Sequence, residues 1–161
     1  MRYLISKITL LFKISLLLLP AKGADWISST YSTVIKNGTM ELPDGSKYSN
    51  FDQTGQGTSN LGKYVITKCS GNRLDKKGKL VEINLFCEIE VDDGNKYWTK
   101  LNRTSGDSDA GVSKFIFLGG TNSYNKLKGK QCTYAVTYFK NKIFGSNKCK
   151  ISDALFKELK N

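Results

Sequence analysis

The chain of 161 residues contains no histidine, and this absence excludes several kinds of catalytic site. Histidine is the usual general base near neutral pH, and the Ser-His-Asp and Cys-His arrangements that activate nucleophiles depend on it. An enzyme with this sequence would have to work with carboxylates, lysines or tyrosines alone. No recognisable catalytic motif is built from those residues, so we predict no catalytic residues and no cofactor.

The sequence also lacks the clustered ligands of a transition-metal site. Its cysteines are scattered rather than grouped as CxxC, and no histidine can complete a zinc site. The segment GDSDAG at 106–111 has two acids with one residue between them, as at the start of a calcium loop. It lacks the third oxygen ligand and the distal glutamate. We therefore predict a solvated turn there and no bound metal.

No hydrophobic run is long enough to cross a membrane as a helix. The stretch ITLLFKISLLLLP is interrupted by Lys13 and is shorter than the ~20 residues that a spanning helix needs. The basic start MRYLISK precedes it and the small residues AKGA follow, which is typical of a secretory signal peptide. An uncleaved anchor is the alternative. We predict a signal peptide over 1–23, cleaved after Gly23, and a single domain over 24–161 with no membrane span.

No cysteine precedes Cys69, and the four that follow favour disulfides, as expected for a small exported domain. Cys69 and Cys87 flank the turn-like segment LDKKGKL, and Cys132 and Cys149 flank FKNKIFG. If each segment is a hairpin turn, each pair falls near one rung of its ladder, within bridging distance. The spacing predicts the bridges Cys69–Cys87 and Cys132–Cys149 in a secreted or periplasmic protein.

Alternating apolar and polar residues predict β-strands through most of the chain. In LVEINLFCEIEV (80–91) every odd-numbered residue from Val81 to Val91 is apolar, which indicates a half-buried antiparallel strand with Cys87 facing the core. The segments LPDGSKY and VDDGNKY place Asp-Gly between strand-like runs, which is a strong hairpin signal. Many short strands with evenly spaced turns predict an all-β barrel or sandwich.

Two further segments define the C-terminal part of the domain. In QCTYAVTYF (131–139), Tyr134 and Tyr138 alternate onto the cysteine's face, where their hydroxyls can reach a polar rim or a cavity. The final segment ISDALFKELKN departs from the strand pattern. It has Ser152 as an N-cap, with Ile151 and Phe156 spaced as a hydrophobic staple, so we predict a short terminal helix.

One stretch resembles a known family of barrels. The order of glycines and aromatics in GVSKFIFLGGTNSYNKLKGKQCTYAV (111–136) resembles that of bacterial proteins with an allene oxide cyclase-like barrel. The earlier GQGTSNLGKYVITKCSG (55–71) resembles the preceding part of the pattern, so the resemblance covers roughly residues 40–140. It implies a single antiparallel up-and-down barrel of about eight strands, of calycin type, with an apolar interior. It does not imply the plant enzyme's cyclisation chemistry, since no catalytic position carries over.

Acidic residues are few relative to basic ones, 14 against 25, and the formal net charge is +11. Much of the excess lies in NKLKGK (125–130) and FKNKIFGSNKCK (139–150). A basic face with aromatics nearby can bind an anionic polysaccharide, an acidic membrane surface or nucleic acid. The lysines lack groove-like spacing, which disfavours nucleic acid. The alternative, which we favour, is that these lysines keep an edge strand soluble.

The alternation in NKYWTKL places Trp98 between Lys96 and Lys100 on one face. We expect Trp98 outside the barrel or at its mouth, where it meets a partner or covers the seam with the terminal helix through Leu155, Phe156 or Leu159.

Together these patterns favour an exported, non-catalytic protein whose barrel holds a small, largely apolar ligand. The alternative is a structural or interaction protein of the cell envelope with a basic face for a polyanion, and an enzyme comes third. The candidate ligand-binding residues are Trp98, Tyr134 and Tyr138.

Overall fold

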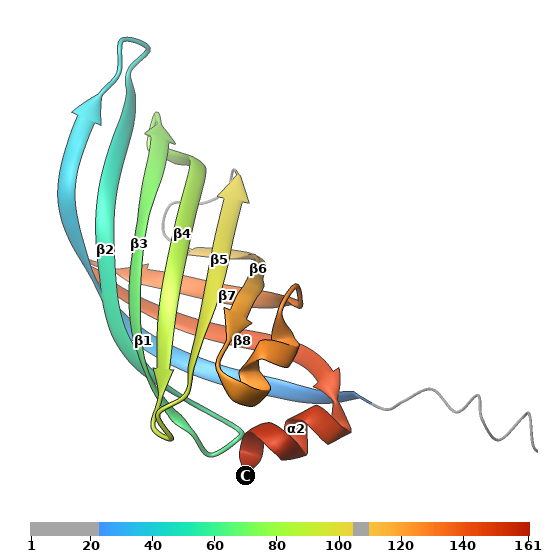
Figure 1. The fold of residues 1–161 in the computed structure, drawn as a ribbon. Coiled ribbons are helices and arrows are strands. Elements are labelled where there is room, and N and C mark those ends of the chain that lie inside the picture. Colours follow the sequence, from blue (N-terminus) through green and yellow to red (C-terminus); the bar gives the residue numbers. More distant parts are fainter. Residues whose placement is uncertain (1–22, 105–109) are drawn as a thin grey trace, which may run out of the picture.

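The computed structural model describes residues 23–104 and 110–161, which form a closed antiparallel β-barrel (Figure 1). Each strand pairs with its neighbours in sequence, and the first pairs with the last, so the barrel is of the up-and-down type. The predicted fold class, with eight strands and a short terminal helix, is confirmed. The elements are β1 (Gly23–Glu41), β2 (Ser46–Ser59), β3 (Tyr64–Lys76), β4 (Lys79–Val91), β5 (Lys96–Thr104), β6 (Ala110–Gly120), the 3-10 helix η2 (Asn122–Leu127), β7 (Gln131–Phe139), β8 (Lys142–Ser152) and α2 (Asp153–Lys160).

Tight turns at the predicted Asp-Gly sites join β1 to β2 and β4 to β5. Gly45 and Gly94 have φ angles of 77° and 82°, a left-handed conformation that glycine adopts without steric cost. Their amides donate to the carbonyl oxygens of Leu42 and Val91, each at 2.9 Å. These hydrogen bonds close the two turns and fix the register of both hairpins.

Both predicted disulfides are present. Cys69 and Cys87 are paired residues on β3 and β4, with their Cα atoms 4.0 Å apart. A second disulfide, between Cys132 and Cys149, links β7 to β8, and its two Cα atoms are 4.7 Å apart. Disulfides form and persist in oxidising compartments, so the two bridges indicate an extracytoplasmic environment.

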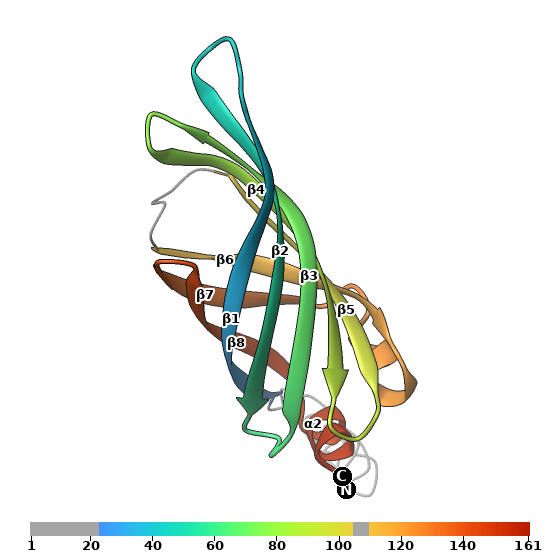
Figure 2. The ribbon, with the colours of Figure 1, turned by 90° about the vertical axis from the view of Figure 1, so that its left-hand side faces the viewer.

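The two ends of the barrel differ. The turns of hairpins β1–β2, β3–β4 and β7–β8 lie at one end, the open end, where the first two hairpins extend beyond the other strands (Figure 2). The opposite end, the capped end, carries η2 and α2 (Figure 1). Helix α2 packs against β1, β8 and η2. Access to the barrel interior is therefore expected from the open end.

Aromatic side chains fill the capped end of the barrel. The aromatic floor consists of Trp26, Tyr97, Phe117 and Tyr124, all of them buried. The Trp26 and Phe117 rings stack with their centroids 5.7 Å apart, and the Tyr97 and Tyr124 rings stack at 5.2 Å. Leu159 of α2 belongs to the same cluster. The two helices thus close this end by completing a hydrophobic core.

The terminal helix begins as predicted. The amide of Leu155 donates to the hydroxyl oxygen of Ser152 at 3.2 Å, so Ser152 is the N-cap. Ile151 is buried in the core cluster that contains the aromatic floor, and Phe156 packs against this cluster. Apolar contacts on both sides of the cap fix the angle at which α2 leaves β8.

The inward orientation predicted for Val81, in the strand at 80–91, is wrong. Leu74 pairs with Glu82 and the next residue, Asp75, pairs with Leu80, so Val81 has no partner and forms a β-bulge. The bulge turns Leu80 inward, to 2% exposure, and leaves Val81 40% exposed. From Ile83 onward the predicted alternation holds.

Candidate ligand cavity

The barrel encloses a cavity of about 590 Å³, and all eight strands contribute to its wall. This volume lies within the range of about 300–1,000 Å³ that is typical of small-molecule sites. The cavity extends from the aromatic floor, which contributes Trp26, Tyr97 and Phe117, to the open end. The interior therefore has room for a small molecule.

The cavity wall is chemically mixed. Strands β2 to β5 contribute the apolar side chains of Phe51, Ile83, Leu85 and Leu101, with the Cys69–Cys87 bridge among them. Strand β1 contributes hydroxyls from Ser28, Thr30 and Ser32 beside the apolar Trp26 and Val34. A ligand inside the barrel would therefore meet apolar surface together with hydrogen-bonding groups.

Tyr134 and Tyr138 lie on the cavity wall, as their predicted inward orientation requires. Burial raises the pKa of Tyr134, although the positive charge of Arg103 acts in the opposite direction. Burial also raises the pKa of Tyr97, on the floor of the cavity. The phenols of Tyr97 and Tyr134 therefore remain protonated near neutral pH, where they are neutral hydrogen-bonding groups. Whether Tyr134 and Tyr138 contact a ligand stays a prediction.

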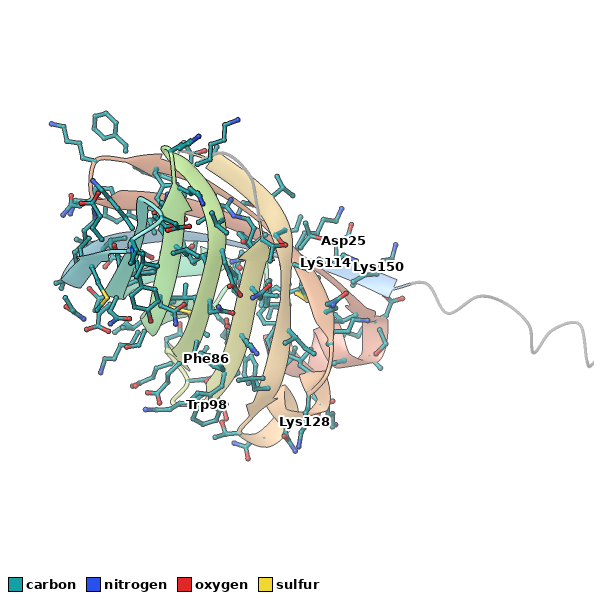
Figure 3. The ribbon with its side chains drawn as sticks, turned by 90° about the horizontal axis from the view of Figure 1, so that it is seen from above. Asp25, Phe86, Trp98, Lys114, Lys128 and Lys150 are labelled. Atoms are coloured by element: carbon teal, nitrogen blue, oxygen red, sulfur yellow. A yellow bond between two sulfur atoms is a disulfide. The ribbon has the colours of Figure 1, made fainter. Side chains whose placement is uncertain are left out.

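Trp98 lies on the outer surface of β5 and is 37% exposed, as the alternation predicts (Figure 3). Its indole nitrogen donates to Oε2 of Glu88 at 3.3 Å, and Lys96 forms an ion pair with the same carboxylate at 3.0 Å. Trp98 is thus separated from the cavity wall that holds Tyr134 and Tyr138. The helix residues proposed to cover it pack against the core cluster with Trp26 instead: Leu155, Phe156 and Leu159.

Sequence reasoning missed the part of the wall that carries unsatisfied polar atoms. Trp26 Nε1 and Thr67 Oγ1 are buried, and neither makes a hydrogen bond with any described residue. Both residues line the cavity. Buried polar groups are normally hydrogen-bonded, so a donor and a hydroxyl in this state are consistent with a partner supplied from the cavity.

Charged residues of the cavity wall gather at the open end. Lys36, Lys140 and Asn141 are exposed, so they mark the mouth of the cavity. On the β3–β4 hairpin, the guanidinium of Arg73 donates to both carboxylate oxygens of Asp75, at 2.7 and 2.8 Å. The mouth is polar and carries positive charge, whereas the floor is aromatic.

A buried arginine bridges the place where two strands diverge. Pairing between β5 and β6 ends at Leu101 and Phe115. Beyond that point Arg103, which is buried, donates from Nη1 to the carbonyl oxygen of Ala110 at 3.2 Å. A Cβ atom on Gly111 would lie 1.1 Å from the same Nη1 atom. The guanidinium therefore occupies space that only a glycine at 111 leaves open.

Replacing Gly111 with alanine is expected to lower the free energy of unfolding by about 1–3 kcal/mol, because the guanidinium of Arg103 must shift to make room. Gly38→Ala is the matched control. No atom lies within 4 Å of a Cβ there, and its φ is not left-handed, so the change should be neutral or stabilising by less than about 1 kcal/mol. Urea unfolding of the two variants measures both effects. Equal stabilities would contradict this packing of Arg103.

Several other features bear on alternative sites. In residues 23–104 and 110–161 no three potential metal ligands from acidic or cysteine side chains come together. Most of the loop considered for calcium, 106–109, lies outside the described residues, as does the predicted signal peptide up to residue 22. No helix in the described part of the chain is long and apolar enough to span a membrane.

The outward lysines of the basic segment 139–150 need a different explanation from the one we favoured, and Lys114 of β6 lies on the same outer surface. The barrel is closed, so protection of an edge strand does not account for them. Lys114 and Lys150 are exposed on the outer surface (Figure 3). Lys148 forms an ion pair with Asp25 at 2.9 Å. This surface is basic and is separate from the cavity.

The fold and the cavity define the class of protein, which is a closed, disulfide-linked up-and-down β-barrel with an internal cavity. No known family model matches the chain, and a search of curated proteins finds no similar sequence.

Proposed function

We propose that the protein is an exported, non-catalytic binding protein whose barrel holds a small, largely apolar ligand. The observation that carries this proposal is the cavity of about 590 Å³, with its aromatic floor, its apolar wall on β2 to β5 and its mouth at the open end. Burial of apolar ligand surface against such a wall is favourable by roughly 25 cal/mol per Å² before the costs of association. The neutral tyrosines and the absence of histidine support binding rather than catalysis.

The proposal includes export through the secretory route, with cleavage of residues 1–23 and release into the periplasm or the medium. The two disulfides support it because both require an oxidising compartment. The resemblance to allene oxide cyclase-like barrels is consistent with the same function and carries no catalytic role.

A cavity-filling substitution tests the proposal. Val136 lines the cavity on β7, so Val136→Trp should place its indole inside and weaken binding of the neutral fluorescent probe N-phenyl-1-naphthylamine at least tenfold. Val112→Trp is the control, because Val112 is 71% exposed on the neighbouring strand β6. Fluorescence titration gives the affinities, and circular dichroism checks that both variants fold. Equal affinities, or no binding by the unmodified protein, would contradict the proposal.

The outward lysines support a second candidate function, recognition of a polyanion at the cell envelope. Lys114 and Lys150 carry it, since closure of the barrel removes the need for edge protection. Adding heparin to the same titration separates the two functions. Binding of heparin that weakens steeply with salt, without binding of the neutral probe, would favour the envelope role.

A further inference from the structure

Strand β1 carries exposed apolar side chains on the outside of the barrel beside the cavity mouth. The outward Tyr31 and Ile35 are 39% and 53% exposed, although the inward residues of the strand include the apolar Trp26 and Val34 as well as three hydroxyl residues. Apolar residues that a strand turns away from the barrel interior stay exposed unless another molecule covers them. The exposed side therefore requires an explanation that the cavity does not give.

Neighbouring strands extend this apolar surface. Phe144 of β8 is paired with Tyr31, and their rings meet edge to face at 5.1 Å between centroids. Phe139, at the end of β7, is paired with Lys142 and is 63% exposed. Because Thr33 is paired with the same lysine, Phe139 lies near the part of β1 that leads to Ile35. We call Tyr31, Ile35, Phe139 and Phe144 the mouth-side patch.

Lysines are interleaved with the mouth-side patch. Lys140 Nζ lies 5.6 Å from the centroid of the Phe139 ring, and Lys142 Nζ lies 5.8 Å from that of Tyr31. Neither lysine forms an ion pair with a described residue. Asp52, which is paired with Ile35 on β2, accepts hydrogen bonds from Ser70 and Asn37, which lower its pKa and keep it negatively charged. The patch therefore combines exposed rings with two lysines that outnumber this one carboxylate.

The mouth-side patch adjoins the mouth of the cavity. Lys140, beside Phe139 of the patch, lines the cavity mouth. The amide of Val34 donates to the carbonyl oxygen of Asn141 at 2.8 Å, which holds the β7–β8 turn beside β1. Lys36 of the mouth directly follows Ile35 of the patch. A surface that covers the patch would therefore lie next to the cavity entrance.

We propose that the mouth-side patch docks on an anionic lipid membrane, so that the cavity opens beside the lipid surface. Aromatic side chains favour the interface between headgroups and acyl chains, and lysines are attracted to anionic headgroups. A polysaccharide would use the charge, but it would leave most of the apolar area of Ile35, Phe139 and Phe144 without an apolar partner. The lipid surface complements both properties of the patch. This inference goes beyond ligand binding and does not depend on it.

Vesicle co-sedimentation tests the proposal. The full mature chain should bind vesicles of phosphatidylcholine with 30% phosphatidylglycerol at least tenfold more tightly than vesicles of phosphatidylcholine alone. The double variant Phe139→Ser/Phe144→Ser should weaken binding to the anionic vesicles at least tenfold. The double variant Lys140→Asn/Lys142→Gln should weaken it by about tenfold or more at low salt. Asparagine is chosen at 140 because that residue has a φ of 56°, which asparagine tolerates.

Matched controls change the same residue types on other parts of the barrel. Phe86→Ser removes a half-exposed ring from the outer face of β4, and Lys114→Gln/Lys150→Gln removes two charges from the basic surface of β6 and β8. The phenylalanine control should leave vesicle binding unchanged, and the lysine control should weaken it less than threefold. Val136→Trp, which fills the cavity, should also leave it unchanged. Failure of the unmodified protein to bind the probe, with retained vesicle binding, would therefore contradict only the cavity proposal.

Three outcomes would overturn the docking proposal. The first is failure of the mature chain to bind anionic vesicles at low salt. The second is wild-type vesicle binding by Phe139→Ser/Phe144→Ser, which would show that the exposed rings do not reach lipid. The third is heparin binding as tight as vesicle binding that Lys140→Asn/Lys142→Gln abolishes and Phe139→Ser/Phe144→Ser leaves unchanged, which would assign the patch to a polysaccharide.

Discussion

Replacing Phe117 with alanine is expected to lower the free energy of unfolding by about 3–5 kcal/mol, because it removes a buried ring from the aromatic floor and enlarges the space beside it. Phe117 is 1% exposed. Its ring contacts three others of the core, with centroid separations of 5.7 Å to Trp26, 5.4 Å to Tyr97 and 5.4 Å to Phe115. Urea unfolding followed by circular dichroism measures the change.

Phe86→Ala provides the control for this loss. The Phe86 ring lies on the outer face of β4, half exposed, with Lys100 Nζ 5.3 Å from its centroid. Its removal should change the free energy of unfolding by about 0.5 kcal/mol or less, since little buried contact is lost. Similar losses in the two variants would contradict the assignment of Phe117 to the core of the capped end.

Reducing the two disulfides is expected to lower the free energy of unfolding by about 3 kcal/mol for each bridge, because the reduced chain regains entropy when unfolded. The bridges join residues 18 and 17 positions apart, and the loops they close do not overlap. Their joint effect of about 6 kcal/mol is comparable with the whole stability of many small domains. Urea unfolding with and without dithiothreitol measures the difference.

A variant with all four cysteines changed to alanine separates bond breakage from any direct effect of the reductant. Its unfolding midpoint should be the same with and without dithiothreitol, and lower than that of the oxidised protein. Peptide mapping without reductant should recover Cys69 linked to Cys87 and Cys132 linked to Cys149. An unchanged midpoint on reduction of the native chain would contradict a stabilising role for the bridges.

Local signals in the sequence were sufficient to predict the hairpins and the bridges. The turns at Asp-Gly 44–45 and 93–94 can be predicted from these residues alone, because the left-handed backbone of such turns favours glycine. The bridge between Cys69 and Cys87 can also be predicted locally, since a short turn between two adjacent strands places the two cysteines at paired positions. Pairs that lie close in sequence can be inferred from sequence alone.

The cavity wall on β1 could not be predicted in the same way. Alternation assigns the apolar face of a strand to the interior, yet in the middle of β1 Ile27, Tyr31 and Ile35 face outward and Ser28 and Ser32 face the cavity, between the inward Trp26 and Val34. Polar residues are tolerated there because part of the interior is cavity rather than packed core. A pattern rule that assumes a filled core therefore fails at the site of interest.

Two other features could not be predicted from the local sequence. One depends on an irregularity in strand pairing, and the other depends on contacts between distant segments. The bulge at Val81 shifts the register of β4 against β3, and nothing in the alternation of β4 reveals it. The 3-10 helix η2 contributes Tyr124 to the aromatic floor and buries Leu127 in the same core cluster. Its segment reads as a polar turn in the sequence, because its burial depends on the whole capped end being assembled.

The order of strands around the barrel has a consequence for how fast the chain can fold. All neighbouring strands are also neighbours in sequence except β1 and β8, whose pairing joins residues such as Ser28 and Asn147, 119 positions apart. Hairpins close short loops at small entropic cost, whereas closing a loop of that length costs more. The β1–β8 seam is therefore the non-local step of folding. We expect folding times of milliseconds to seconds, as in other β-rich domains, with the seam formed after the hairpins.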